Sequence, residues 1–309
     1  MTNAKTSRII CRVTLGTATV QRAYAACEAL ARSQYENFPV ASRLLPAAMR
    51  PHVAAVYGFA RVADDMADEG DVPAGERLAR LAAWQRRLHE ALEGGTAAAA
   101  EGDRDALIIV AAAHTIRQLD LPPSLFDDLI SAFGQDTMTT RYDSWPALFD
   151  YCRRSANPVG RLVLRIAGHR DEHLDRSSDA FCTALQLTNF WQDLGRDWKA
   201  GRLYVPREVY ASFGASEDQL RAGDIDQAWT RAMGECVRVT RDLFQQGRAV
   251  CDGVVGRLRY ELRLTWLGGR RVLDRVELRG ARMLTERPTI GVADVPMMLA
   301  RAVGWSTHA

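Results

Sequence analysis

Two aspartates in the segment 53–70 have a spacing that suits metal chemistry. Asp64 and Asp68 are four residues apart, so a helix places both on one side, and Arg61 joins that side from one turn earlier. The segment before them is rich in Val, Ala, Tyr and Phe. Because acids within an apolar helix need a compensating cation, this pair indicates more than a solvated surface.

A second row of oxygen-bearing side chains lies in the segment 185–206. Asn189, Asp193 and Asp197 repeat every four residues, and Gln186 extends the row by about one turn. Oxygen ligands from two helices suit Mg²⁺, which takes one or two carboxylates per ion and completes its coordination with phosphate oxygens. One such motif is common on solvated helices. Two of them, each in an apolar helix beside arginine, predict a site for Mg²⁺ and a diphosphate.

The elements that must position these motifs are predicted to be helices. Apolar residues recur at helical spacing along most of the chain, and alternating strand patterns are scarce. No internal repeat or long linker divides the chain, so we expect one all-α domain over 18–305 after a loose tail, 1–17. A short extended piece is expected at 201–206. The predicted helices are 18–34, 51–69, 74–93, 103–119, 123–141, 145–168, 174–199, 225–252, 256–285 and 292–303.

The composition excludes several classes of protein. The chain has 309 residues, 47% of them hydrophobic and 25% charged, which is typical of a globular protein and excludes a disordered one. A formal net charge of only +2 argues against a dedicated nucleic-acid binder. The chain has no run of about 18 apolar residues, and we expect no signal peptide. We therefore expect a cytoplasmic protein, with peripheral contact at the inner face of the membrane as an alternative.

Three further features are assigned no chemistry. The six cysteines include no C-x-x-C pair, so we expect free thiols. His169 and His173 have a spacing that zinc ligands use, but their polar surroundings supply no third ligand, so solvated histidines are expected. Asp136 follows Gln135 before a predicted turn, and the pattern does not indicate which way its side chain faces.

The acidic motifs and their flanks resemble those of a known family. ARVADDMAD and NFWQDLGRDW, the latter followed by GRLYVP, are similar to sequences of the squalene/phytoene synthases, and the resemblance covers about residues 30–290. It implies an isoprenoid-synthase-type helical bundle around a central cavity, which binds three Mg²⁺ ions and a prenyl diphosphate. The implied metal ligands are Asp64, Asp68, Asn189, Asp193 and Asp197. The four aspartates and Tyr151, near the reacting carbons, would be catalytic. The residues implied near the diphosphate are Tyr57, Arg61, Gln186, Arg202 and Tyr204.

Two other segments resemble one branch of this family. ENFPVAS (36–42) and YCRRSANPVGR (151–161) are similar to the bacterial hydroxysqualene synthases of hopanoid biosynthesis. That resemblance implies Mg²⁺-dependent ionisation of presqualene diphosphate, rearrangement of the cation and its capture by water, which would make the protein a carbon–oxygen lyase. It also implies substrate contacts from Asn37 and Phe38, no use of NADPH, and other enzymes of the squalene and hopanoid pathway as candidate partners.

Five aromatic residues are candidates to line the pocket that such a cation requires. The pocket must be apolar and aromatic, so that it excludes stray bases and admits one positioned water. For each residue the alternative is ordinary packing in the core. The candidates are Phe38, Phe59, Tyr151, Phe190 and Trp191.

The chain departs from the family pattern at two positions inside the expected site. Gln192 stands where an arginine usually precedes the first acid of the second motif, so we expect one cationic contact with the diphosphate to be missing. Gly269 stands where a cavity tyrosine is common, so we expect open space there that water can reach. Gln192, together with YENF (35–38) in place of the usual Ser-x-Ser/Thr-Phe patch, favours the hydroxysqualene branch over a synthase that binds two diphosphates. Gly269 is compatible with water reaching the cation.

Two other functions stay open as alternatives. The first is a condensing prenyltransferase of the same family, which makes presqualene diphosphate or phytoene from two allylic diphosphates. The second is a non-catalytic assembly or binding factor of the same fold. Such a factor would be expected to lose its metal-binding acids, and the presence of all four aspartates argues against it.

Overall fold

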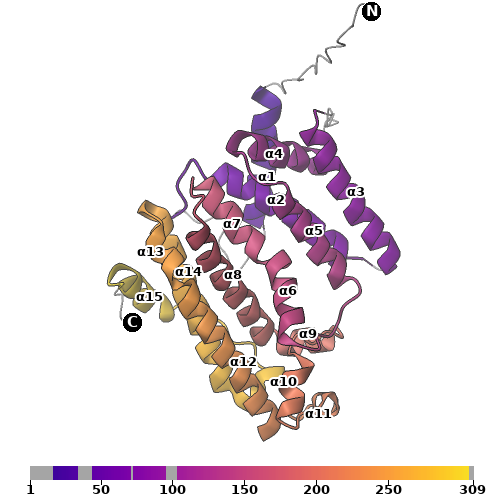
Figure 1. Ribbon diagram of the computed structural model, residues 1–309, viewed down its shortest axis with the longest axis vertical. Helices are drawn as coiled ribbons and strands as arrows, with labels where there is room; N and C mark the ends of the chain where they lie inside the picture. The colour runs from indigo at the N-terminus through magenta and orange to yellow at the C-terminus, as the bar shows by residue number, and fades with distance from the viewer. Residues whose placement is uncertain (1–16, 34–43, 71, 95–102, 306–309) are drawn as a thin grey trace, which may run out of the picture.

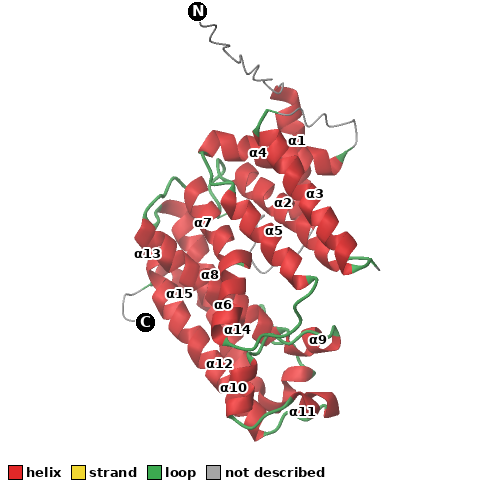
Figure 2. Cartoon of the chain, turned by 45° about the vertical axis from the view of Figure 1, so that its right-hand side comes forward, coloured by secondary structure: helices red, strands yellow, loops and turns green. Residues whose placement is uncertain are grey.

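Helices make up the described structure (Figure 2). The computed structural model describes residues 17–33, 44–70, 72–94 and 103–305. This part contains no strand, and the extended piece expected at 201–206 consists of one isolated bridge between Arg141 and Leu203. The elements are α1 (Thr17–Ser33), α2 (Arg50–Asp68), α3 (Ala74–Leu92), α4 (Arg104–Leu119), α5 (Ser124–Asp136), α6 (Trp145–Ser155), α7 (Asn157–Ile166), α8 (Glu172–Gln192), α9 (Leu194–Lys199), α10 (Arg207–Ser212), α11 (Glu217–Ala222), α12 (Gln227–Gln246), η1 (Gly247–Ala249), α13 (Val250–Gly253), α14 (Gly256–Arg279), η2 (Gly280–Leu284) and α15 (Asp294–Val303).

The helices form two groups that pack against each other (Figure 1). In the first group, α2 packs against α1, α4 and α5. In the second, α8 is central and packs against α6, α7, α12 and α14. α7 also contacts α2 and α5, so it joins the two groups. The all-α architecture predicted from the apolar spacing is confirmed. The loose tail predicted at 1–17 lies outside the described residues, except for Thr17 at the start of α1.

The predicted helix 145–168 is two helices in the structure, α6 and α7. α6 ends at Ser155, and Pro158 lies in the first turn of α7. A proline within a continuous helix would remove one backbone hydrogen bond and clash with the preceding turn, so the chain restarts instead. The other long predictions are also subdivided: 225–252 contains α12, η1 and α13, and 256–285 contains α14 and η2.

The predicted helix 174–199 is broken at Asp193. α8 ends at Gln192, the backbone of Asp193 has φ −99° and ψ 10°, and the short α9 begins at the next residue. The second acidic row therefore does not run along one helix. Asn189 lies on α8, Asp193 lies at the break, and Asp197 lies on α9.

Two of the candidate cavity aromatics lie in the core instead. The ring of Phe59 stacks on Trp84 with centroids 5.5 Å apart and meets Phe126 edge-on at 5.2 Å. Trp191 is buried, and its Nε1 donates a hydrogen bond to Thr240 Oγ1 at 2.8 Å. For Phe59 and Trp191 the alternative, ordinary packing in the core, is confirmed, because these rings pack between helices.

The described cysteines are free, as predicted: Cys27, Cys152, Cys182, Cys236 and Cys251. Cys11 lies outside the described residues. No described helix combines the length and the apolar character needed to cross a membrane.

Gly195 allows the backbones of α9 and η2 to come into direct contact. A Cβ atom at this position would overlap the backbone carbonyl of Leu284, the last residue of η2. Only glycine permits this contact without a shift of one backbone. The contact holds the segment that follows η2 against the break between α8 and α9.

Replacing Gly195 by alanine should destabilise the fold by about 1–3 kcal/mol, the usual cost of overpacking. Thermal unfolding followed by circular dichroism measures this change. The matched control is Gly234→Ala on α12, where the new Cβ would meet nothing within 4 Å. That substitution should stabilise the protein by about 0.4–1 kcal/mol, because alanine restricts the unfolded chain and favours helix. If both substitutions changed the stability equally, the close contact between α9 and η2 would not be what requires glycine at position 195.

Candidate active site

Arg202 joins the two acidic motifs. Asp68 is the last residue of α2, and Arg202 lies in the loop that follows α9. The Arg202 Nη2 atom is 2.5 Å from Asp68 Oδ1. This ion pair brings the end of α2 beside the segment that carries Asp197, so the two motifs share one site.

Asp197 holds its proton more strongly than an ordinary aspartate. Burial raises its pKa to about 7, and the negative charges of Asp193 and Asp68 act in the same direction. The positive charge of Arg202 opposes them. The carboxyl group is therefore partly protonated near neutral pH, and a cation placed here would favour its ionised form.

Arg287 is a cation of this site that motif spacing does not reveal. Its Nε and Nη2 atoms donate to the two carboxylate oxygens of Asp193 at 2.5 and 3.0 Å. Gln192 is buried and turns away from the acids, since its Nε2 donates to the Pro288 carbonyl at 2.5 Å. Arg287, from the segment after η2, thus places a cation beside the second acidic motif, where Gln192 provides none.

Arg61 pairs with the acids of α2. Its guanidinium lies 3.2 Å from Asp64 Oδ2 and 2.6 Å from Asp65 Oδ1. Tyr57 is one turn earlier on the same helix and packs half-buried against the core. The implied contacts from Asn37 and Phe38 lie outside the described residues.

A buried pair of Asp136 and Tyr151 lies close to these charges. The Tyr151 hydroxyl donates to Asp136 Oδ2 at 2.6 Å. Burial, together with the charges of Asp68 and Asp64, raises the pKa of Asp136 to about 7, while the hydrogen bond from Tyr151 and the charge of Arg202 oppose this rise. Its second oxygen, Oδ1, is buried and has no hydrogen-bond partner among the described residues. Asp136 is therefore part of the site, although its only sequence signal is its position at the end of an apolar helix.

Aromatic rings form a wall next to this pair. Phe190 and Tyr204 stack face to face, with centroids 3.8 Å apart and 5° between the planes. Tyr151 lies beside them, at 6.1 Å from Phe190 and 6.3 Å from Tyr204. Tyr142 extends the wall at 5.7 Å from Tyr204. Tyr151, Phe190 and Tyr204 therefore lie together in one cluster of rings.

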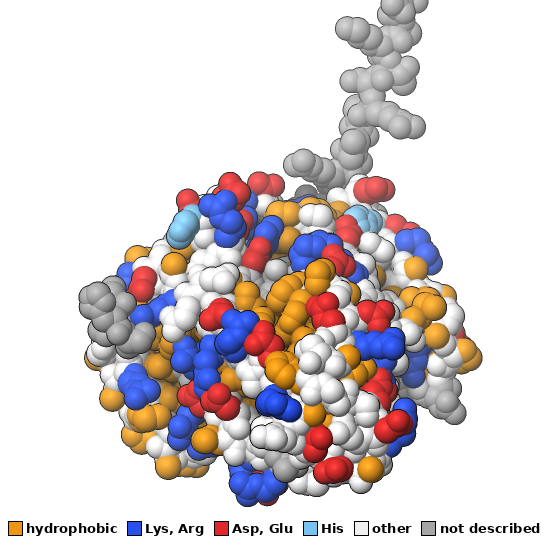
Figure 3. Space-filling view, turned by 60° about the horizontal axis from the view of Figure 1, so that its bottom comes forward, with side chains coloured by type: hydrophobic (Ala, Val, Ile, Leu, Met, Phe, Trp, Pro, Cys, Tyr) orange, Lys and Arg blue, Asp and Glu red, His pale blue; other side chains and the backbone are white. Residues whose placement is uncertain are grey.

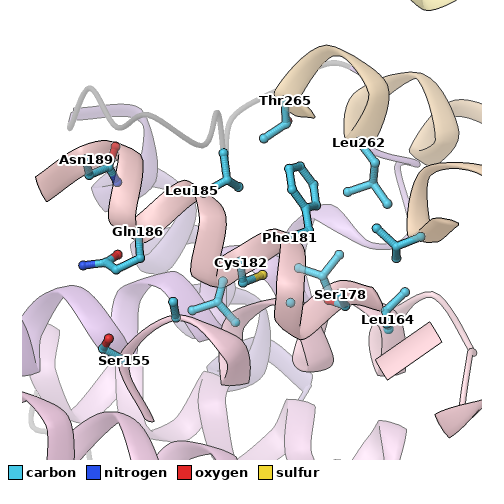
Figure 4. Close-up of a pocket in the computed structure, with 15 residues that line it drawn as sticks. Ser155, Leu164, Ser178, Phe181, Cys182, Leu185, Gln186, Asn189, Leu262 and Thr265 are labelled. Carbon is cyan, nitrogen blue, oxygen red and sulfur yellow. The ribbon is translucent and has the colours of Figure 1, made fainter. Parts of the chain in front are cut away.

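An apolar cavity of about 180 Å³ starts one turn from the acids and follows α8 (Figure 4). Gln186 and Asn189 lie at one end, on the side of α8 that leads to Asp193. The remaining lining comes from the end of α6, from α7 and α8, from the start of α13 and from α14. It is mostly apolar and includes Phe181, Leu185, Cys182, Leu164 and Leu262. The cavity is thus suited to a hydrocarbon chain.

A second hollow of about 350 Å³ lies between α8 and α14. It shares Leu185, Asn189 and Thr265 with the first cavity. Gly269 borders it, but a Cβ at Gly269 would come within 2.7 Å of both Leu185 Cδ2 and Phe244 Cζ. Gly269 therefore borders open space, as expected, but Leu185 and Phe244 fill the direction in which its own side chain would point.

Apolar and charged side chains meet on one face of the molecule (Figure 3). Hydrophobic side chains gather at its centre, with both acidic and basic side chains around them. Such a surface suits a ligand that carries a charged group on an apolar body.

The acids suit Mg²⁺ if the substrate completes its coordination. Within the described ranges, no three Asp, Glu, His or Cys side chains converge closely enough to hold one ion. Mg²⁺ usually takes one or two carboxylates and completes its coordination with water or phosphate oxygens. Asp64 with Asp68, and Asp193 with Asp197, are hard oxygen donors in sets of that size. The residues therefore fit Mg²⁺ bound together with a diphosphate.

Comparison with known proteins places the chain among isoprenoid synthases. Residues 31–294 match the family described as squalene/phytoene synthase. The hydroxysqualene synthase of Zymomonas mobilis is 41% identical over 189 residues, which cover 60% of this chain and 60% of that one. The 15-cis-phytoene synthase of Synechococcus elongatus is 27% identical over 92% of this chain and 95% of that one.

A solved structure shows the same fold. The crystal structure of squalene synthase HpnC from Alicyclobacillus acidocaldarius matches with a TM-score of 0.78 and 38% identity, over 86% of this chain and 97% of that one. The family match includes both acidic motifs as well as Arg202, Arg287 and Asp136. The chain therefore belongs to the squalene/phytoene synthase family of isoprenoid synthases.

Proposed function

We propose that this protein is a hydroxysqualene synthase. The reaction is the Mg²⁺-dependent ionisation of presqualene diphosphate, with rearrangement and capture by water to give hydroxysqualene and diphosphate, and it uses no NADPH. One observation carries the proposal: Asn189 lies one turn before Asp193 and borders both apolar hollows. The acidic motifs thus lie at the end where the two hollows meet. This arrangement suits a substrate with one diphosphate and two hydrocarbon arms. The name of the Zymomonas relative supports the same reaction.

Three arginines are available to the leaving diphosphate. Arg61, Arg202 and Arg287 each pair with an acid of the two motifs. Their planar donor groups suit the oxygens of a diphosphate. Mg²⁺ bound by the four aspartates would neutralise the charge that develops on the departing group. The arginines and acids would then exchange partners when the substrate binds.

The aromatic wall would stabilise the hydrocarbon cation. The faces of Tyr151, Phe190 and Tyr204 carry the negative part of the ring quadrupole, which attracts a cation. Asp136 accepts the hydrogen bond of the Tyr151 hydroxyl and so fixes its direction. A fixed hydroxyl can position one water, while the apolar lining excludes others.

The alternative is condensation of two allylic diphosphates, which the similarity to a phytoene synthase supports. Two apolar hollows would also accept two separate prenyl chains. The two reactions differ in substrate and in the source of oxygen in the product. These differences decide between them.

Pure protein with Mg²⁺ should consume presqualene diphosphate and leave farnesyl diphosphate unchanged. In ¹⁸O-labelled water the product alcohol should carry the label, because water captures the cation. Mass spectrometry of the products measures both outcomes. Unlabelled alcohol, squalene formed only with NADPH, or turnover of farnesyl diphosphate alone would each contradict the proposal.

Asp64→Ala should lower turnover by at least about 100-fold, because a major electrostatic stabiliser of the leaving group is lost. The measurement is steady-state turnover of presqualene diphosphate with saturating Mg²⁺. Asp218→Ala is the matched control, since Asp218 is an exposed acid of α11 that pairs with Arg221 and should leave the rate unchanged. EDTA should abolish activity while circular dichroism shows intact helices. Full activity of Asp64→Ala would exclude a role for the acids of α2 in binding the metal ion.

Binding of diphosphate with Mg²⁺ should tighten as the pH rises from 6 to 8. The pKa of Asp197 is raised to about 7 by burial, so below that pH the metal must displace a proton from it. Affinity should therefore rise through pH 7 and then level off. Isothermal titration with Mg²⁺ and diphosphate at both pH values measures the change. Asp197→Asn should bind more weakly and lose most of this pH dependence, and an unchanged profile would refute the assignment.

A further inference from the structure

A pocket of about 560 Å³ lies where α14 packs against α15. Its lining comes from the end of α12, from η1, α14 and α15, and from the residues just after α15. The lining includes no residue of either acidic motif. Sites for small organic ligands usually have volumes of about 300–1,000 Å³, so this pocket can admit such a molecule. The chemistry of the lining indicates which class of molecule fits.

Positive charge exceeds negative charge in this lining. Four arginines and one acid line the pocket: Arg248, Arg270, Arg271, Arg301 and Asp274. The acid is already neutralised, because Asp274 Oδ1 lies 2.9 Å from Nη2 of Arg241, an arginine that is not part of the lining. Arg271 is paired as well, with its Nε atom 2.9 Å from Asp294 Oδ1. The other arginines leave the pocket with a net positive charge, which suits an anion.

Arg270 lacks the acceptors that its buried donors need. Its Nε and Nη1 atoms are buried and have no hydrogen-bond partner within the described ranges of the chain. Burial lowers the pKa of its guanidinium, while the charge of Asp274 opposes this change and the charge of Arg241 adds to it. Buried donors without acceptors are costly. An anion that accepted these hydrogen bonds would therefore be bound favourably.

Tryptophan rings hold the arginines of this pocket. The Cζ atom of Arg270 lies 5.1 Å from the ring centroid of Trp266, and that of Arg248 lies 4.6 Å from the ring centroid of Trp305. Arg263 also lies over Trp305, at 5.1 Å. A guanidinium that stacks on a ring keeps its N–H donors in its own plane, where they suit the oxygens of a phosphate group. Arginines thus cover the ring faces that a nucleobase would need for stacking.

We propose that this pocket is a second ligand site, which binds the diphosphate group of a small molecule with an aliphatic body. The arginines donate to the diphosphate oxygens without a metal ion, because the one acid of the lining is already paired. Leu267, Met297 and Met298 also line the pocket and supply apolar contacts for the aliphatic body. The inference rests on this pocket alone and does not depend on the proposed reaction.

Titration calorimetry of the full-length protein in EDTA tests the proposal. The probe is geranyl diphosphate, and the comparison ligands are inorganic diphosphate and ADP. Without Mg²⁺ the acidic motifs repel a diphosphate, whereas the arginine pocket does not need the metal. We expect one geranyl diphosphate per chain, bound more tightly than either comparison ligand. Absence of binding would overturn the site, and tighter binding of ADP or of inorganic diphosphate would overturn its preference for an aliphatic body.

Arg270→Met should separate binding from stability. Loss of hydrogen bonds to a charged group should weaken binding of the probe by about tenfold or more. The same change should raise the melting temperature of the free protein, because it removes a buried charge that has no acceptor. The probe should raise the melting temperature of the wild type and not that of the variant. A lower melting temperature with unchanged binding would assign Arg270 to the fold and overturn the proposal.

Two matched arginine variants locate the bound probe. Arg202→Gln alters the site of the acidic motifs, and Arg238→Gln alters an exposed arginine of α12 that pairs with Glu235. Both variants should bind geranyl diphosphate in EDTA like the wild type, and circular dichroism should show equal helix content. Loss of binding in Arg202→Gln with retention in Arg270→Met would place the probe among the acidic motifs and refute the second site. These measurements need no turnover, so their failure would leave the proposed reaction untouched.

Discussion

Carboxylates that face a site between apolar helices need counter-charges, and arginines provide them here. Asp68 pairs with Arg202 at 2.5 Å, and Asp193 pairs with Arg287 at 2.5 Å. Each pair joins segments that are far apart in sequence. The contacts that neutralise the acids therefore also fix how these segments pack. A partly buried carboxylate that lost its partner would be strongly destabilising. The arginines that hold these acids in place are thus the kind of cation that also pairs with phosphate oxygens.

The helical architecture and the two acidic motifs are predictable from the sequence, because both follow from periodicity. Apolar residues at helical spacing define the faces that pack, and acids at the same spacing fall on a common side. The break at Asp193 is not predictable in this way. It depends on the bidentate contact from Arg287 and on the close approach of Gly195 to Leu284, and both are contacts with a segment almost 100 residues away.

Side-chain surroundings account for the other differences. Asp136 has no motif, and only the fold shows that Tyr151 donates to it and that burial shifts its pKa. In the sequence, Gly269 indicates only that a side chain is missing. In the structure, Leu185 on α8 and Phe244 on α12 lie where that side chain would begin. Neighbouring side chains therefore fill the direction of the missing side chain, and the open space lies beside them in the hollow between α8 and α14.

Met298 lines both the second hollow and a pocket of about 560 Å³ that Trp266 and Trp305 also line, so this flexible side chain lies between the two spaces. Methionine has three rotatable bonds and a soft thioether, which let it change shape without disturbing the backbone. Rotamer changes of this kind are far faster than movements of whole helices. A change in this one side chain would therefore alter how the two spaces connect, with no opening of the helical bundle.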